Sequence, residues 1–86
     1  MVRQEITVVK DQVKKYFPKG VKLSRAEFRR LFIEKYNAEY NRKGEDLFEP
    51  RHDTIGYQLD LLVKEGWLYR EVTGEKSNKI KFARKD

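Results

Sequence analysis

The sequence predicts a small α+β domain with three helices, a C-terminal two-stranded β-hairpin and a short third strand near residues 21–23. Three observations lead to this fold class. A length of 86 residues allows one hydrophobic core, because a second core would bury too little apolar surface to offset its ordering entropy. Apolar residues recur at spacings of three and four as far as Gly66, which is the helical period. Beyond Gly66 the pattern alternates as in strands, so we expect one domain over residues 1–86.

A first helix is expected over residues 5–17. Ile6, Val9 and Val13 recur at helical spacing and predict its buried side. Pro18 follows directly and cannot continue a helix.

The second helix is expected over residues 24–40. Its start is a capping box, in which the Ser24 hydroxyl accepts from the amide of Glu27 and the Glu27 side chain reaches back to the amide of Ser24. The preceding residues 21–23 alternate and have the length of a short strand that pairs with the hairpin. A break follows at residues 41–44.

A polar connection over residues 45–50 leads to a third helix over residues 51–65. Pro50 suits a first helical position and Asp53 suits an N-cap. Gly66 suits the left-handed conformation that ends a helix. The expected core side of this helix carries Ile55, Leu59 and Leu62.

The hairpin is expected over residues 67–83. Residues 67–72 are aromatic and β-branched, residues 73–78 are turn formers, and Ile80 begins a second alternating run. Residues 83–86 are expected to form a frayed tail.

This order of elements resembles the winged-helix superfamily. Leu59, Leu62, Gly66 and Leu68 also form the pattern Leu-x-x-Leu-x-x-x-Gly-x-Leu at the junction of the third helix and the hairpin, or wing. Members of that superfamily bind DNA, RNA or other proteins. The resemblance implies that the third helix enters a major groove and that the wing lies along the backbone or the minor groove.

The composition favours a polyanionic partner. The net charge is +6 and the pI is about 9.6, values that promote binding through counterion release. Residues 1–43 contain twelve basic residues (Lys or Arg) and five acidic residues (Asp or Glu). Residues 44–63 contain one basic and five acidic residues, and residues 64–86 contain seven basic and four acidic residues. The segment that contains the third helix is therefore acidic, between two basic ones. The absence of cysteine excludes disulfides and thiol chemistry. The sequence also has no apolar stretch long enough to span a membrane. We therefore expect a cytoplasmic protein, which would be nucleoid-associated if it is prokaryotic or viral.

Outward positions of the third helix are candidates for base or phosphate contacts. Gln58 matches adenine, Thr54 matches a thymine methyl group, and Arg51 reaches guanine or phosphate. The full set on this helix is Arg51, Thr54, Tyr57, Gln58, Leu61 and Lys64. The alternative is an ordinary solvated face, which the carboxylates of Asp53 and Asp60 on the same side favour.

Two further groups of cations are candidate phosphate contacts. The wing group comprises Arg70, Lys76, Ser77, Asn78, Lys79 and Lys81. The alternative is that these residues form a solvated hairpin edge, on which the lysines prevent aggregation with other strands. Arg25 and Arg29 lie beside the start of the second helix, where free amides also favour phosphate. The alternative is that the arginines of this region form ordinary ion pairs along the helix surface, such as Arg30 with Glu34. Among the aromatic residues, Tyr57 and Tyr69 are candidates for stacking, whereas Trp67, Phe82 and Phe48 are expected to pack in the core.

The sequence offers little for catalysis. His52-Asp53 lacks further metal ligands, because His52 is the only histidine, and Glu45, Asp46 and Glu49 lie in a loop expected to be solvated. We therefore expect no enzyme, no metal and no cofactor.

The leading expectation is a winged-helix DNA-binding protein that regulates transcription. The alternatives are a protein-interaction module that uses Tyr57 and Leu61, and a protein that binds structured RNA or the ribosome. No membrane partner is expected. The chain is expected to be a monomer, or a homodimer formed through the first or second helix.

Overall fold

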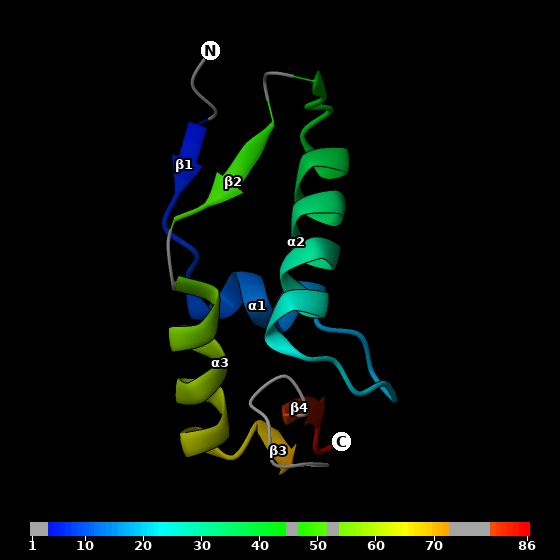
Figure 1. Ribbon diagram of the computed structural model, residues 1–86, viewed down its shortest axis with the longest axis vertical. Coiled ribbons are helices and arrows are strands. Elements are labelled where there is room, and N and C mark those ends of the chain that lie inside the picture. The colour runs from blue at the N-terminus through cyan, green and yellow to red at the C-terminus, as the bar shows by residue number, and fades with distance from the viewer. Residues whose placement is uncertain (1–3, 45–46, 52–53, 73–79) are drawn as a thin grey trace.

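The computed structural model describes residues 4–44, 47–51, 54–72 and 80–86. Within these ranges the chain is an α+β structure, as the sequence predicts, with three helices and four strands (Figure 1). Their order is β1 (Gln4–Ile6), α1 (Lys10–Tyr16), α2 (Arg25–Glu39), β2 (Phe48–Pro50), α3 (Thr54–Glu65), β3 (Leu68–Val72) and β4 (Ile80–Arg84). The strands form two separate pairs, β1 with β2 and β3 with β4, at opposite ends of the long axis (Figure 1).

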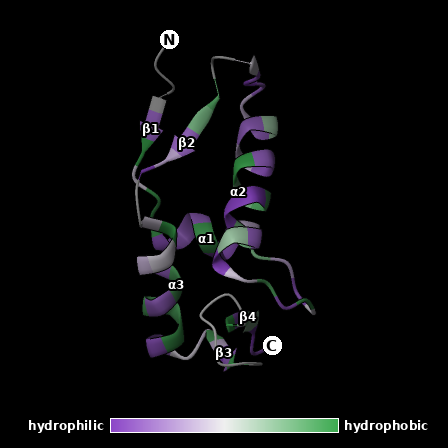
Figure 2. Cartoon of the chain, viewed as in Figure 1, coloured by the Kyte–Doolittle hydropathy of each residue, from purple (hydrophilic) through white to green (hydrophobic). Residues whose placement is uncertain are grey.

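One hydrophobic core joins the helices to the β3–β4 hairpin. Phe17 and Phe28 stack with their ring centroids 5.1 Å apart, which packs the end of α1 against α2. Figure 2 shows the hydrophobic colour on the inner side of α3 and the hydrophilic colour on its outer side. The buried cluster consists of Val8, Val13, Phe17, Phe28, Phe32, Ile55, Leu59, Leu62, Leu68 and Phe82.

The first expected helix begins later than the sequence predicts. Residues 4–6 form β1, and α1 starts only at Lys10. Val9, expected in the core, is 49% exposed, whereas Val8 is fully buried. The physical reason is that this run of β-branched residues is extended, so Ile6 and Val8 share one side by the strand period of two.

The start of α2 confirms the capping box. The Ser24 hydroxyl accepts from the Glu27 amide at 3.2 Å, and Oε1 of Glu27 accepts from the Ser24 amide at 2.9 Å. The helix ends at Glu39, within one residue of the expected end, and Asn41 follows with a positive φ of 54°.

The connection between α2 and α3 contains a strand that the sequence analysis does not predict. Phe48–Pro50 forms β2, parallel to β1, with Glu5 opposite Glu49. Pro50 therefore ends a strand and does not start a helix. On the other edge of β2, the backbone of Phe48 is hydrogen-bonded by Asn37 of α2. Oδ1 of Asn37 accepts from the Phe48 amide at 2.7 Å, and Nδ2 of Asn37 donates to the Phe48 carbonyl at 3.1 Å. A side-chain amide thus replaces a third strand.

Helix α3 begins at Thr54, three residues after the expected start, and the expected N-cap Asp53 lies outside the described residues. Its end confirms the expected glycine stop. Gly66 has a φ of 85°, its amide bonds to the Val63 carbonyl, and the Trp67 amide bonds to the Leu62 carbonyl at 3.0 Å. These two bonds satisfy carbonyls of the last helical turn.

The hairpin pairs β3 with β4 in antiparallel register, with Arg70 opposite Phe82. The short strand expected at residues 21–23 is reduced to one residue, Leu23, which exchanges backbone hydrogen bonds with Phe82 at 2.9 and 2.7 Å. The chain end is not frayed: β4 continues to Arg84, and the Lys85 amide bonds to the Trp67 carbonyl at 3.2 Å.

Asn37 offers a test of the β2 anchor. Its side chain is 3% exposed, so Asn37→Ala leaves the amide and carbonyl of Phe48 without partners in a partly buried place. We expect a loss of about 1–3 kcal/mol in the free energy of unfolding, measured by urea denaturation. The control is Glu34→Ala on the exposed side of α2, expected to change stability by less than about 0.5 kcal/mol. Equal stabilities for the two variants would show that Asn37 does not anchor β2.

Candidate nucleic-acid interface

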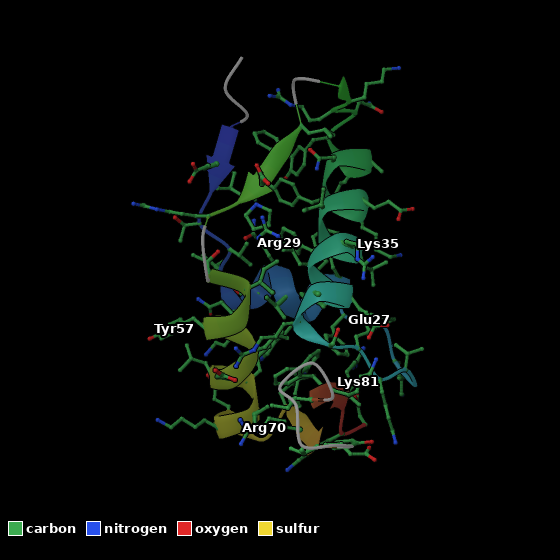
Figure 3. All side chains as sticks on the ribbon, in the orientation of Figure 1. Glu27, Arg29, Lys35, Tyr57, Arg70 and Lys81 are labelled. Atoms are coloured by element: carbon green, nitrogen blue, oxygen red, sulfur yellow. The ribbon has the colours of Figure 1, made fainter. Side chains whose placement is uncertain are left out.

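The outward side of α3 and strand β3 share a shallow hollow of about 420 Å³, which we call the α3–β3 hollow. Four of its residues follow the helical period along one side of α3, and Arg70 reaches it from the hairpin (Figure 3). Its lining comprises Tyr57, Asp60, Leu61, Val63, Lys64 and Arg70. The structure therefore brings together four of the residues that the sequence analysis selects, namely Tyr57, Leu61, Lys64 and Arg70.

The chemistry of the α3–β3 hollow is mixed apolar and cationic. Tyr57 is 63% exposed, and Leu61 and Val63 add half-buried aliphatic surface beside it. Lys64 and Arg70 are exposed, and neither has an ion-pair partner within the described part of the chain. Their charges are therefore available to a polyanion, and no ion pair among the described residues has to break when Lys64 or Arg70 binds one.

At the start of α3, the Arg51 side chain is available to a ligand, whereas the Thr54 hydroxyl is already hydrogen-bonded. Arg51 is exposed, and among the described residues its guanidinium has no carboxylate partner. The Thr54 hydroxyl donates to the Arg51 carbonyl at 2.7 Å, which commits its proton to the turn that starts the helix. Gln58 is half-buried and does not line the α3–β3 hollow.

Asp60, expected to oppose a polyanion, is neutralised by Arg25. Nη2 of Arg25 donates to both carboxylate oxygens of Asp60, at 3.2 and 3.0 Å. From the sequence, Arg25 is a candidate phosphate contact and Asp60 a repulsive carboxylate, so their pairing is a new finding of the structure. No local pattern connects residues that lie in different helices, so only their opposite charges could have suggested it.

Arg29 is directed away from the α3–β3 hollow and toward β2 (Figure 3). Its guanidinium lies 3.4 Å from a Glu49 carboxylate oxygen and 3.4 Å from the Pro50 carbonyl. Glu5 and Glu49 face each other in the β1–β2 register, so a cation here offsets the repulsion between neighbouring carboxylates. Arg29 and Arg25 line a second hollow of about 460 Å³ between α2, α3 and β2, which we call the α2–β2 hollow.

The wing is only partly described. Lys76, Ser77, Asn78 and Lys79 lie outside the described residues. Lys81 donates to Oε1 of Glu27 at 2.5 Å and so ties β4 to the first turn of α2. That hydrogen bond, together with the one from the Ser24 amide, lowers the pKa of Glu27 from 4.5 to about 2. In this structure Lys81 therefore holds the hairpin against α2.

The aromatic residues divide between core and surface. Phe82 is fully buried, as expected, and Phe48 packs against Tyr36 with ring centroids 5.4 Å apart. Trp67 is partly buried against the core and has the Arg84 guanidinium 4.8 Å from its ring centroid. Tyr69 is exposed on β3, so with Tyr57 it keeps an accessible ring.

Within the described ranges, no three histidine or acidic side chains gather as metal ligands would. His52, Asp53, Glu45 and Asp46 lie outside those ranges. The described helices are too short or too polar to cross a membrane.

The contact between Lys81 and Glu27 makes stability depend on pH. The folded-state pKa of Glu27 lies below its ordinary value, so its stabilisation is complete above about pH 4.5 and is lost as the pH falls toward 2. The pair is partly exposed, so we expect Glu27→Gln to cost about 1 kcal/mol at pH 7 and little at pH 2. Glutamine keeps the capping hydrogen bond. Urea denaturation at both pH values measures the difference, with Glu34→Gln as the control for charge removal. A cost that is the same at both pH values would contradict this role of the pair.

Comparisons with protein-family models, with curated proteins and with solved structures gave no match for this chain.

Proposed function

We propose that this chain is a winged-helix DNA-binding protein, and that it regulates transcription by contacting duplex DNA through α3 and the β3–β4 hairpin. The arrangement of elements supports the assignment. Leu23, between α1 and α2, pairs with β4, and α3 leads through the Gly66 turn directly into the hairpin. With β1 and β2 left aside, the order α1, Leu23, α2, α3 and hairpin resembles the helix, strand, helix, helix, hairpin order of the winged-helix superfamily, whereas β1 and β2 are additional to that order.

The observation that carries the proposal is the shared surface of α3 and the hairpin. Lys64 from α3 and Arg70 from β3 line the same hollow, and neither is neutralised by a described carboxylate. Two elements far apart in a DNA groove would each bind weakly, whereas adjacent cations on a helix and a wing can follow one backbone.

The dimensions of α3 suit a major groove. An α-helix with its side chains is about 10–12 Å across and the groove is about 12 Å wide, so the twelve residues of α3 can lie along it. Tyr57 and Leu61 would then face base edges or sugars, where Leu61 can contact a thymine methyl group. The pairing of Asp60 with Arg25 removes the uncompensated carboxylate that would otherwise repel phosphates on this side.

A second candidate function is supported by the apolar part of the α3–β3 hollow. Tyr57, Leu61 and Val63 form a surface on which a side chain from a protein partner could pack. In that case binding would depend on Tyr57 and Leu61 and would be insensitive to the removal of Lys64 and Arg70.

A salt titration with matched variants tests the proposal. The interface variant carries Arg51→Ala, Lys64→Ala and Arg70→Ala. The control variant carries Lys19→Ala, Lys35→Ala and Lys43→Ala, which removes the same charge from exposed lysines remote from α3. Figure 3 shows Lys35 on α2 and Tyr57 on the outer side of α3, pointing in opposite directions. Fluorescence polarisation with a random duplex gives the affinity at each salt concentration.

We expect wild type to bind at micromolar concentration in low salt, with a steep log–log dependence on salt. The interface variant should lower the slope by about one unit for each phosphate group that it no longer binds, and the control should change it by less than one unit. Absence of wild-type binding, or equal slopes for both variants, would contradict the proposal. A hairpin RNA that competes better than the duplex at fixed salt would identify RNA as the partner instead.

A further inference from the structure

The contact between Arg25 and Asp60 bridges the two helices at the edge of the proposed interface. Asp60 lines the α3–β3 hollow, and Arg25 lines the neighbouring α2–β2 hollow, so the pair stands on the ridge between them. The two side chains are 56% and 48% exposed. A ligand that covers α3 can therefore reach the pair directly.

Gly56 forms the surface over which Arg25 extends. Glycine inside a helix reduces its stability, so its presence one turn before Asp60 calls for a structural reason. A Cβ built at this position would lie 3.5 Å from Cδ, 3.6 Å from Nε and 3.7 Å from Cζ of Arg25. A methyl group fits at those distances, but a longer side chain would need the space that Arg25 occupies. The missing side chain thus lets the arginine lie against α3.

The hydrogen bonds leave part of the guanidinium unused. Both bonds to Asp60 come from Nη2, and within the described part of the chain no acceptor binds Nε or Nη1. An arginine carries donors on all three nitrogens in one plane. Arg25 can therefore donate to a second anion while it stays paired with Asp60.

We propose that Asp60 is a positioning residue and that Arg25, held across Gly56, is a phosphate-binding anchor of the DNA interface. This inference rests on the proposed function and adds a role for a carboxylate that would otherwise oppose DNA. A free arginine loses rotamer entropy when it binds a phosphate, and that loss has already occurred when Asp60 holds the guanidinium. With Nη2 held by Asp60, Nη1 or Nε can then donate to a phosphate from a fixed position.

The sign of the coupling between the two residues separates this role from simple charge neutralisation. If Asp60 only neutralises Arg25, removing Asp60 frees the arginine and Arg25 then contributes more to binding. If Asp60 positions Arg25, removing Asp60 makes Arg25 contribute less. The removal of a negative charge raises the affinity in both cases, so Asp60→Asn alone is not diagnostic.

The experiment is a double-mutant cycle of Arg25→Gln and Asp60→Asn, measured as salt-dependent binding to a random duplex. In wild type, Arg25→Gln is expected to weaken binding several-fold and to lower the salt slope by about one unit. In the Asp60→Asn background its effect should be at least about threefold smaller, with almost no change of slope. Arg30→Gln, an exposed cation elsewhere on α2, controls for the removal of charge and should act equally in both backgrounds.

Two substitutions of Gly56 test, independently of Asp60, whether Arg25 needs the space that the glycine leaves on α3. Both add a residue that favours helix, so thermal melts should show folded proteins with unchanged or higher melting temperatures. With Gly56→Ala, Arg25→Gln should weaken binding as it does in wild type. With Gly56→Leu, the leucine displaces the guanidinium and Arg25→Gln should have little further effect.

The outcomes distinguish this inference from the proposed function. Wild-type protein that binds no duplex overturns both. Wild-type binding, combined with an Arg25→Gln effect that is equal or larger in the Asp60→Asn background, overturns the positioning role alone. An undiminished effect of Arg25→Gln in the Gly56→Leu background also overturns it.

Discussion

The central constraint in this structure is the burial of Phe82, which lies between strand β3 and the single bridging residue Leu23. Its side chain is fully buried in the core, and its backbone bonds to Leu23 on one side while its register partner on the other side is Arg70. The hairpin is therefore fixed to the helices by both packing and hydrogen bonds. The candidate interface depends on this attachment, because it places Arg70 beside α3 and Lys81 beside the start of α2.

The pairing of charges says more about the interface than their total. The chain has a net charge of +6, but several of its cations are already engaged by carboxylates in the fold. Arg25, Arg29 and Lys81 all contact acidic side chains, and each of these contacts joins two elements of structure. Lys64 and Arg70 have no such partner in the described chain and lie together beside α3, whereas other cations without one, such as Lys35 on α2, lie elsewhere. These ion pairs thus join elements of the scaffold, and the candidate binding surface is the place where Lys64 and Arg70 lie side by side.

The opposite end of the molecule is organised by one polar side chain. A two-stranded parallel ribbon is marginal by itself, because each strand leaves an edge of unpaired amides and carbonyls. Asn37 supplies the missing partner for β2, and its Nδ2 also donates to the Ile33 carbonyl at 2.7 Å. Burial of this asparagine costs little because Nδ2 donates twice and Oδ1 accepts once. It also aligns α2 with β2, which leads directly into α3.

The sequence by itself determined the features that depend on neighbouring residues. The capping box at Ser24, the glycine stop at Gly66 and the alternation that produces the hairpin each involve a few consecutive positions, and each is present in the structure. Only the tertiary structure decided the parallel pairing of β1 with β2, the Asn37 contacts and the contact of Arg25 with Asp60. These join residues from separate elements, and their partners are selected by how the helices pack, which no local pattern encodes. The same reason explains the misplaced start of α1: periods of two and of three to four both fit the short run from Ile6 to Val9, and pairing with β2 selected the extended form.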